Sequence, residues 1–338
     1  MIKTLIVDDS PLVRTILRNF LESDISFEIV GEAENGKEGV EKALELNPDL
    51  ITMDIEMPIM GGLDAISEIK KALNTPIVVI STYDTAKMAY EATVKGAMEF
   101  YAKDVFTQRN PVKQKQVLGT LKQISGIKGR VPFKPDSVVR EARRVENRKI
   151  DAVVIAASTG GPKALSQLYA AMPGDFPVPI ITVQHNSSGF DKGFIQWLNT
   201  YTPLEVRLAE MGERPLKGNI YVAPTGQHLL IGYKGFLFND GEPVNNQKPA
   251  ADVLFRSAAQ AYQNAVVSVV LTGMGCDGAE GTRYIRKAGG ITIAQDEESS
   301  LIYGMPKAAA ETGCVDMVLP LDKIPSKLVF LTRGQEKW

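Results

Sequence analysis

The sequence predicts an α/β protein of two domains, each built around a parallel sheet covered by helices on both faces. The chain has 338 residues, which is more than one average domain holds. Its first 124 residues alternate short apolar, β-branched runs with segments of helical spacing, and strand-like runs resume near residue 150. Such alternation is typical of parallel sheets. We expect a flavodoxin-like domain with a parallel five-stranded sheet first, and a doubly wound domain with a mostly parallel sheet second.

The first domain is expected to contain five strands, each followed by a helix. Ser10 can cap the first helix, Pro11 suits its first position, and Asn47-Pro48 ends the second helix. The expected strands are Thr4–Val7, Glu28–Ala33, Asp49–Met53, Pro76–Ser81 and Glu99–Ala102. The expected helices are Pro11–Leu21, Gly36–Leu46, Gly62–Leu73, Thr85–Lys95 and Gln114–Ile124.

Polar residues follow four of these strands at their carboxyl ends, where open sheets of this kind bind ligands. They are Asp8, Asp9, Asp54, Thr82 and Lys103. The strand order 2-1-3-4-5 would bring the three carboxylates together. Like charges that close repel unless a cation is present. Mg²⁺ suits oxygen ligands and keeps positions open for phosphate oxygens, so we expect Mg²⁺ here.

The same residues suit transfer of a phosphoryl group to a carboxylate. A carboxylate can attack a phosphoryl group and hold it covalently. Asp54 is the better candidate, because the adjacent Asp8 and Asp9 can serve the metal. Lys103 would add a fixed positive charge and Thr82 a hydroxyl donor. Each residue taken alone is more simply explained as a solvated side chain in a loop, but the combination favours a site.

These positions resemble the receiver domain of bacterial response regulators over about the first 124 residues. The matching motifs are VDD at Val7–Asp9, MDIEMPIMGG at Met53–Gly62, ST at Ser81–Thr82 and AK at Ala102–Lys103.

The receiver resemblance implies that Asp54 is the phospho-acceptor and contributes to the metal site. It implies that Asp8 and Asp9 bind Mg²⁺ with it, and that Thr82 and Lys103 sense the phosphoryl group. Lys103 is followed by Asp104, where the family usually has proline. A cis peptide bond is therefore not expected at this position.

Residues 125–149 are expected to link the two domains. The stretch from Gly126 to Ile150 carries eight Lys/Arg against three Asp/Glu, a net charge of +5. A patch for nucleic acid or an acidic partner is one interpretation. A solvated linker is favoured, because Phe133 is the only aromatic residue in the stretch and no nucleic-acid motif follows.

The second domain, residues 150–338, opens with a strand at Ala152–Ala157 that leads into Ser158. A tight Thr159-Gly160-Gly161 turn follows, and Pro162 suits the first position of the next helix. Ser158 can cap that helix, belong to a phosphate cradle of glycine N–H groups, or act as a nucleophile on a sharp turn. These residues alone leave the three interpretations open, since the motif is neither GxGxxG, a Walker A loop nor GxSxG.

Two further strand ends supply partners for a nucleophilic serine. His185 follows the strand Pro179–Gln184, and Asp277 lies in the glycine-rich turn after the strand Ala265–Leu271. In one parallel sheet these residues would share an edge with the serine, as base and orienting carboxylate. His228, the only other histidine, stands at the start of a strand and need not share that edge.

The surrounding motifs resemble the catalytic domain of the CheB family of chemotaxis methylesterases. The order receiver, linker, esterase also matches, so the resemblance spans nearly the whole chain. The motifs are ASTGGP at Ala157–Pro162, QH at Gln184–His185, PAADVLFRSAA at Pro249–Ala259, LTGMGCDGAEG at Leu271–Gly281 and YGMPKAA at Tyr303–Ala309.

The CheB resemblance implies a catalytic triad of Ser158, His185 and Asp277. It makes the backbone N–H groups of Thr159 and Met274 candidates for the oxyanion hole. Two positions depart from the family pattern and remove no triad atom. The chain has Asn186-Ser187-Ser188 where Met-Pro-Pro is usual, and Cys276 where asparagine usually precedes the aspartate.

This resemblance implies phosphorylation-activated hydrolysis of glutamate γ-methyl esters on methyl-accepting chemoreceptors, with glutamine deamidation in some members. The implied partners are the receptors and a chemotaxis histidine kinase that phosphorylates Asp54. No cofactor is expected for ester hydrolysis. The alternative is a receiver-controlled, non-catalytic binding module in a related signalling pathway, which the unusual loop at 186–188 keeps open.

Composition disfavours other classes of function. The net charge of −2 and Val/Ile strands such as NIYVAP and ITIAQD disfavour nucleic-acid binding through a helix-turn-helix. No acidic ribose partner at a suitable distance supports a nucleotide-binding enzyme. The two cysteines fit no disulfide framework or metal spacing. No signal peptide is expected at the N-terminus, and no apolar run approaches the ~20 residues that span a bilayer. We expect a cytoplasmic monomer without membrane insertion.

Overall fold

The computed structural model describes residues 1–82, 86–107, 111–126, 149–187 and 189–333. The chain forms two compact units, Met1–Pro132 and Phe133–Trp338. Thr85, most of the expected linker and Ser188 lie outside the described residues. The domain limits 1–124, 125–149 and 150–338 remain predictions.

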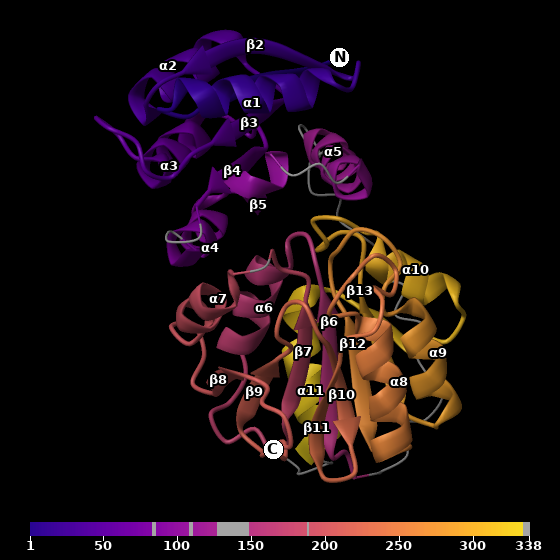
Figure 1. Cartoon of the computed structure of the whole chain (residues 1–338). Helices are drawn as coiled ribbons and strands as arrows, with labels where there is room; N and C mark the ends of the chain where they lie inside the picture. Colours follow the sequence, from indigo (N-terminus) through magenta and orange to yellow (C-terminus); the bar gives the residue numbers. More distant parts are fainter. Residues whose placement is uncertain (83–85, 108–110, 127–148, 188, 334–338) are drawn as a thin grey trace. The chain divides into compact units, whose positions relative to one another are not determined.

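The first unit contains one five-stranded parallel sheet in the predicted order β2-β1-β3-β4-β5 (Figure 1). The strands are β1 (Ile2–Val7), β2 (Phe27–Ala33), β3 (Leu50–Met53), β4 (Ile77–Ser81) and β5 (Glu99–Ala102). The helices are α1 (Pro11–Glu22), α2 (Gly36–Leu46), α3 (Gly62–Ala72), α4 (Ala86–Lys95) and α5 (Pro111–Ser125), with a 3₁₀ turn η2 (Lys103–Phe106). Every expected strand and helix of this unit is present, and only the ends differ.

Local sequence explains several of these ends. Ser10 Oγ accepts the N–H of Val13, and Pro11 lies in the first turn of α1, as expected. Asn47 ends α2 in the left-handed conformation, with its N–H bonded to the carbonyl of Ala43. The strands β3 and β4 are buried along their whole length, which explains why they contain apolar runs rather than alternating polar residues.

The second unit contains a seven-stranded sheet in the order β14-β13-β12-β6-β7-β9-β8, and all its pairs are parallel. Its strands are β6 (Ala152–Ala157), β7 (Ile180–Gln184), β8 (Glu205–Leu208), β9 (Asn219–Val222), β12 (Val266–Val270), β13 (Ile291–Gln295) and β14 (Met317–Leu319). A separate antiparallel hairpin is formed by β10 (His228–Gly232) and β11 (Gly235–Asn239). The predicted α/β class is therefore confirmed for both units.

Helices cover both faces of this sheet. They are α6 (Gly161–Ala170), α7 (Asp191–Leu198), α8 (Ala251–Tyr262), α9 (Ala279–Lys287), α10 (Met305–Glu311) and α11 (Ile324–Arg333), with a 3₁₀ turn η3 (Leu321–Lys323). α8 packs on β6, on β12 and on β10 of the hairpin, and its Leu254 and Phe255 share a core with Val154 of β6. α6 and α11 contact each other, and α11 lies behind the sheet in Figure 1. This arrangement buries β6 on both sides.

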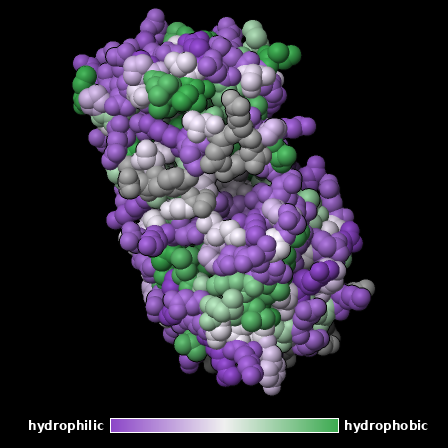
Figure 2. Space-filling model, in the orientation of Figure 1, coloured by the Kyte–Doolittle hydropathy of each residue, from purple (hydrophilic) through white to green (hydrophobic). Residues whose placement is uncertain are grey.

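On the face shown in Figure 2, hydrophilic side chains predominate and apolar side chains form separate groups. Among the helices that the structure describes, none has the length and apolar character needed to span a bilayer.

Candidate functional site

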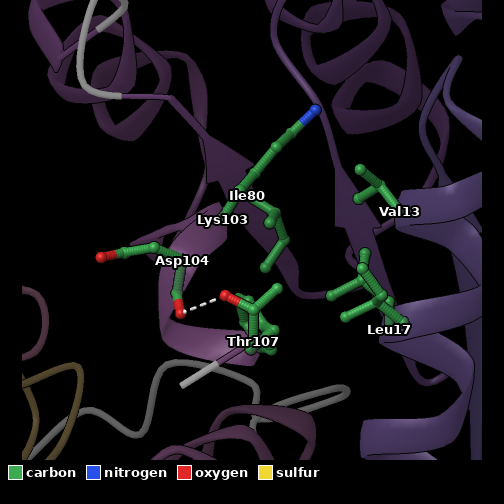
Figure 3. A pocket seen from close by; sticks show the side chains of 8 residues that line it. Val13, Leu17, Ile80, Lys103, Asp104 and Thr107 are labelled. Atoms are coloured by element: carbon green, nitrogen blue, oxygen red, sulfur yellow. Dashed lines mark hydrogen bonds between the residues drawn. The ribbon is translucent and has the colours of Figure 1, made fainter.

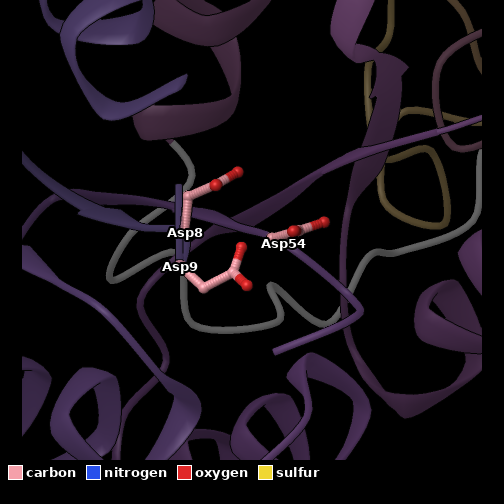
Figure 4. Close-up of side chains that lie close together, drawn as sticks. All are labelled: Asp8, Asp9 and Asp54. Carbon is pink, nitrogen blue, oxygen red and sulfur yellow. The ribbon is translucent and has the colours of Figure 1, made fainter. Parts of the chain in front are cut away.

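Three aspartates meet at the carboxyl edge of the first sheet (Figure 4). Asp8 and Asp9 follow β1, and Asp54 follows the neighbouring strand β3. Each offers a carboxylate oxygen, and these oxygens lie within 4.8 Å of one another. Asp8 and Asp54 are buried, whereas Asp9 is exposed. The observed strand order therefore brings together the three carboxylates that the sequence singled out.

Lys103 brings a positive charge to this cluster. It begins η2, and its side chain extends away from Asp104 and Thr107, which line an apolar pocket with it (Figure 3). Its Nζ atom lies 2.7 Å from Oδ2 of Asp54 and 2.9 Å from Oδ2 of Asp8. Three carboxylates and one ammonium leave a formal charge that one divalent cation would balance.

Burial makes the charged form of this cluster costly. Burial raises the pKa of Asp54 to about 6, although the hydrogen bond from Lys103 opposes the rise and the Asp8 charge adds to it. Burial also raises the pKa of Asp8, again against the effect of Lys103. Oxygen ligands in a buried pocket with excess negative charge fit a hard divalent cation such as Mg²⁺.

Arg14 supports the backbone of the aspartate pair, and the sequence did not single it out. Its largely buried guanidinium donates to the carbonyl oxygens of Asp8 at 2.8 Å and Asp9 at 3.3 Å. It also pairs with Glu32 and Glu34 at the end of β2. An arginine in the first turn of the helix that follows the aspartates was the signal that could have indicated this support.

The loop after β3 approaches α3 closely. Asp54 Oδ1 accepts the N–H of Ile55 at 2.8 Å. A Cβ atom on Gly62, the first residue of α3, would lie 1.9 Å from the carbonyl oxygen of Asp54. Glycine at this position therefore lets the helix begin directly beside the acidic cluster.

Thr82 follows β4 at the same edge of the sheet, and it is exposed. The peptide bond from Lys103 to Asp104 is trans, as the missing proline predicts. Lys103 reaches Asp8 and Asp54 in this geometry, so the departure at Asp104 does not remove the lysine from the cluster.

Ser158 follows β6 at the carboxyl edge of the second sheet. Its N–H donates to the carbonyl of Thr272 at 3.0 Å, and its own carbonyl accepts the N–H of Gly161 at 2.7 Å. Gly160, with a φ of 75°, is the N-cap residue of α6, and no side chain caps this helix. The interpretation of Ser158 as the cap of the helix is therefore wrong.

His185 and Asp277 meet at this same edge, because β7 and β12 flank β6. The Nε2 atom of His185 lies 2.9 Å from Oδ2 of Asp277. The backbone N–H of His185 donates to the carbonyl of Ala157, the residue before Ser158, at 3.0 Å. Within the described part of the chain, the buried Nδ1 atom of His185 has no hydrogen-bond partner. Nδ1 is thus the ring nitrogen that remains to accept a proton.

The carboxylate of Asp277 accepts hydrogen bonds on both oxygens. The N–H groups of Ala251 and Asp252, in the first turn of α8, donate to Oδ2 at 2.6 Å and to Oδ1 at 3.0 Å. Burial would raise the pKa of Asp277. The hydrogen bond with His185, the positive charge that this ring carries when it is protonated, and the two backbone donors outweigh burial and hold the pKa below its usual range. An ionised carboxylate at this position can orient an imidazole ring.

Gln184 joins the backbones of the serine and the histidine. Its Nε2 atom donates to the carbonyl oxygens of Ser158 and His185, both at 3.1 Å, and its side chain is buried. In the sequence Gln184 stood out only as part of a motif. A glutamine at the end of a fully buried strand was the signal for this role.

The two oxyanion candidates come from backbone segments near Ser158. Thr159 follows Ser158 directly and is buried. Its carbonyl oxygen accepts a hydrogen bond from the Thr272 hydroxyl at 3.0 Å. Met274 follows Gly273, where a Cβ atom would lie 2.7 Å from Cβ of Ser158. Glycine at position 273 therefore lets the loop that carries the Met274 N–H pass close to the serine.

His228 does not join this site. It is the first residue of β10, in the hairpin rather than in the parallel sheet. Its ring contacts the N–H of Ala250 and the carbonyl of Glu242.

Comparison with known proteins identifies the family of this chain. The family model described as CheB methylesterase matches residues 153–328, which is more than half of the chain. The chain belongs to the CheB methylesterase family. The model of the response regulator receiver domain matches residues 4–112, so this CheB family member carries a receiver as its first domain.

Relatives with both domains match over nearly their whole length. The protein-glutamate methylesterase/protein-glutamine glutaminase of Clostridium acetobutylicum is 39% identical, over 98% of each chain. The protein of the same name from Thermotoga maritima is 38% identical, also over 98% of each chain. The crystal structure of the T. maritima CheB methylesterase catalytic domain has 39% sequence identity and a TM-score of 0.53, and covers 54% of this chain and all of that domain.

Two departures from the usual CheB pattern lie near the triad residues. Asn186 and Ser187 follow His185 and are partly buried, while Ser188 lies outside the described residues. Cys276 precedes Asp277 and is exposed, with its Sγ atom 3.8 Å from Oδ1 of Asn245. Both departures leave the contact between His185 and Asp277 in place.

Proposed function

We propose that this chain hydrolyses the γ-methyl esters of glutamate residues on methyl-accepting chemoreceptors. The observation that carries the proposal is the 2.9 Å contact between His185 Nε2 and Asp277 Oδ2, at the sheet edge where the strand before Ser158 also ends. The names of relatives that match over nearly their whole length support this substrate class. They favour catalysis over a non-catalytic binding module.

In the proposed reaction Ser158 Oγ attacks the carbonyl carbon of the ester, and His185 takes the hydroxyl proton on Nδ1. Asp277 holds the ring with its Nε2–H toward the carboxylate and stabilises the imidazolium that forms. When the tetrahedral intermediate collapses, the bond to the methoxy oxygen breaks and His185 returns its proton, which releases methanol. Water activated by His185 then hydrolyses the acyl-serine and frees Ser158.

The oxyanion that develops in both steps needs donors. The N–H groups of Thr159 and Met274 are the proposed donors, because their segments lie beside Ser158. The positive end of α6, which begins three residues after Ser158, favours the same charge.

The same residues suit deamidation of glutamine side chains, an activity that the names of the relatives include. An amide carbonyl presents the same carbon to Ser158. His185 would then protonate departing ammonia instead of methanol. The acyl-serine and its hydrolysis are identical in both reactions.

Asp54 is the proposed phosphorylation site, with a chemotaxis histidine kinase as donor. Asp8, Asp9 and Asp54 would hold Mg²⁺, which when bound offsets the negative charge of the phosphoryl oxygens. Lys103 would pair with one phosphoryl oxygen, which its contact with Asp54 supports, and Thr82 would donate its hydroxyl to another. Phosphorylation would raise esterase activity by shifting the equilibrium between a less active and a more active conformation of the protein. We also propose that the protein is a monomer in the cytoplasm.

Methanol release from methylated receptor membranes tests this function. Wild-type protein is expected to release methanol, and a small phosphodonor with Mg²⁺ is expected to raise the rate. Unmethylated membranes serve as the control. Absence of methanol under both conditions would overturn the proposed activity, and a rate that ignores the phosphodonor would overturn its control by phosphorylation.

A further inference from the structure

We infer that His228, outside the triad, is a positioning residue for His185. Its ring fixes the first turn of α8, this turn holds Asp277, and Asp277 orients His185. The inference rests on the proposed function for its activity measurement. Its hydrogen-bond geometry can be tested without any substrate.

The protonation of the His228 ring follows from its two partners. His228 is 2% exposed. The Ala250 N–H donates to its Nδ1 atom at 3.1 Å, and its Nε2 atom lies 3.0 Å from the carbonyl oxygen of Glu242. A backbone N–H can only donate and a carbonyl oxygen can only accept. Nδ1 must therefore be unprotonated and Nε2 must carry the proton, which fixes one neutral tautomer.

The partner of Nδ1 is the N-cap residue of the helix that holds Asp277. Ala250 has no side-chain acceptor, so it cannot cap α8 itself. The first turn is held from outside instead. His228 takes the N–H of Ala250, while Asp277 takes the N–H groups of Ala251 and Asp252. The ring and the carboxylate thus bind three successive N–H groups of one turn.

Loss of the acceptor at His228 would leave the N–H of Ala250 buried without a partner, which is costly. The turn would shift to find another acceptor, and the donors to Asp277 would shift with it. Asp277 would then hold the His185 ring less well. A misplacement of about 1 Å in a positioned catalytic group can cost about a hundredfold in rate.

Two substitutions separate the bonds of the ring. In His228→Asn, the side-chain Oδ1 atom takes the place of Nδ1 and can still accept from Ala250, while the contact with Glu242 is lost. In His228→Gln, the Nε2 amide can still donate to Glu242, while the N–H of Ala250 loses its acceptor. The pair therefore tests the bond to α8 against the bond to Glu242 in side chains of similar polarity.

Ser257 supplies a control for stability. The N–H of Ile231 in β10 donates to Ser257 Oγ in α8 at 3.0 Å, so this bond also joins β10 to α8. Ser257 lies further along α8, beyond its first turn. Ser257→Ala removes a bond between the same two elements and leaves the turn at Ala250 intact.

For methanol release by the full-length chain, His228→Gln is expected to lower kcat by about tenfold to a hundredfold with little change in KM. His228→Asn and Ser257→Ala are expected to stay within about threefold of wild type, because both leave the acceptor for Ala250 in place. Equal kcat values for His228→Gln and His228→Asn would overturn the inference. A loss in Ser257→Ala as large as that in His228→Gln would overturn it as well.

Nuclear magnetic resonance supplies a readout that needs no substrate. The chain has two histidines, so histidine labelled with ¹⁵N gives two imidazole spin systems, and His228→Asn leaves only that of His185. We expect His228 as the Nε2–H tautomer near neutral pH. We expect the downfield Nε2–H signal of His185 to persist in His228→Asn and to broaden or vanish in His228→Gln.

An Nδ1–H tautomer or an imidazolium at His228 would overturn the inference whatever the enzyme does. If His228→Gln fails to fold, the tautomer of His228 in the wild type and the His185 signal in His228→Asn still test the inference. If wild-type protein releases no methanol while the spectra agree with expectation, the proposed function fails and the positioning of His185 by His228 stands.

Discussion

The Nε2 atom of His185 lies 2.9 Å from Oδ2 of Asp277, and the buried Nδ1 atom is the nitrogen that this contact leaves to accept a proton. A neutral imidazole that donates through one nitrogen accepts through the other. Nucleophilic attack by Ser158 depends on this tautomer of His185, because Nδ1 must be unprotonated to take the hydroxyl proton.

Asp277→Asn should move the proton of the His185 ring from Nε2 to Nδ1. An amide Nδ2 in the place of Oδ2 would donate to Nε2 of His185 and leave the proton on Nδ1. We expect kcat for methanol release to fall about 10⁴-fold with KM little changed. Asp252→Asn is the matched control, since its Oδ1 atom can still accept from Gly278 and Gly281. An equal loss in the control would contradict a specific role of Asp277.

Asp277 also links stability to pH. The pKa of Asp277 is held below its usual range in the folded protein. A carboxylate with a lowered folded pKa stabilises the fold above its unfolded pKa of about 3.9, and this contribution is lost as the pH falls through the folded pKa. Urea unfolding should therefore show a stability difference between wild type and Asp277→Asn that is constant from about pH 5 to 8 and shrinks below about pH 4. A difference that grows on acidification would contradict this.

Gln184→Leu should slow catalysis without removing a triad atom. Leucine has a similar volume but cannot donate to the carbonyl oxygens of Ser158 and His185. We expect kcat for methanol release to fall about tenfold to a hundredfold. Labelling of Ser158 by a serine-reactive phosphonate should slow to a similar extent. Unchanged labelling would show that the amide does not hold the two backbones in place.

Gly273→Ala should displace the nucleophile. A Cβ atom at this position would lie 2.4 Å from Sδ of Met305 and 2.7 Å from Cβ of Ser158, so at least one of them must move. We expect about a hundredfold lower kcat. Gly212→Ala, where a Cβ atom meets nothing within 4 Å, controls for a general effect of alanine, although its φ of 77° brings some strain. Full activity of Gly273→Ala would contradict the close packing of this loop on Ser158.

Asp54→Ala should remove activation by a small phosphodonor and keep the basal release of methanol. The acidic cluster would lose its proposed acceptor, while Ser158, His185 and Asp277 lie in the other unit of the chain. The measurement is the ratio of rates with and without the phosphodonor, at constant Mg²⁺. A variant that remains inducible would show that another residue accepts the phosphoryl group.

The sequence could predict which residues gather at each sheet edge, because alternation of strands and helices fixes a parallel sheet and its carboxyl ends. Asp54 and His185 follow a strand directly, and Asp277 lies in the turn after a strand, so a parallel sheet alone places each of them at its carboxyl edge. The acidic cluster follows from the predicted order 2-1-3-4-5, whereas the contact between His185 and Asp277 depends on the observed positions of β7 and β12 on either side of β6.

The supporting contacts could not be predicted in the same way. The bonds from Gln184 to two carbonyl oxygens, and from Arg14 to the backbone of Asp8, depend on side-chain packing rather than on periodicity. The place of His228 depends on a hairpin that leaves the parallel sheet and packs on α8. Capping of α6 by Ser158 was one of three interpretations that the sequence left open, but the turn uses Gly160 as the N-cap residue instead.

The most direct test of the central claim is methanol release from methylated receptor membranes by Ser158→Ala beside Ser166→Ala. Ser166 is a buried serine of α6 whose hydroxyl donates to the carbonyl of Lys163, so its substitution controls for the loss of a buried hydroxyl in the same helix region. If Ser158 is the nucleophile, Ser158→Ala folds and releases no methanol above background, while Ser166→Ala works close to the wild-type rate. Methanol release by folded Ser158→Ala at the wild-type rate would contradict the assignment.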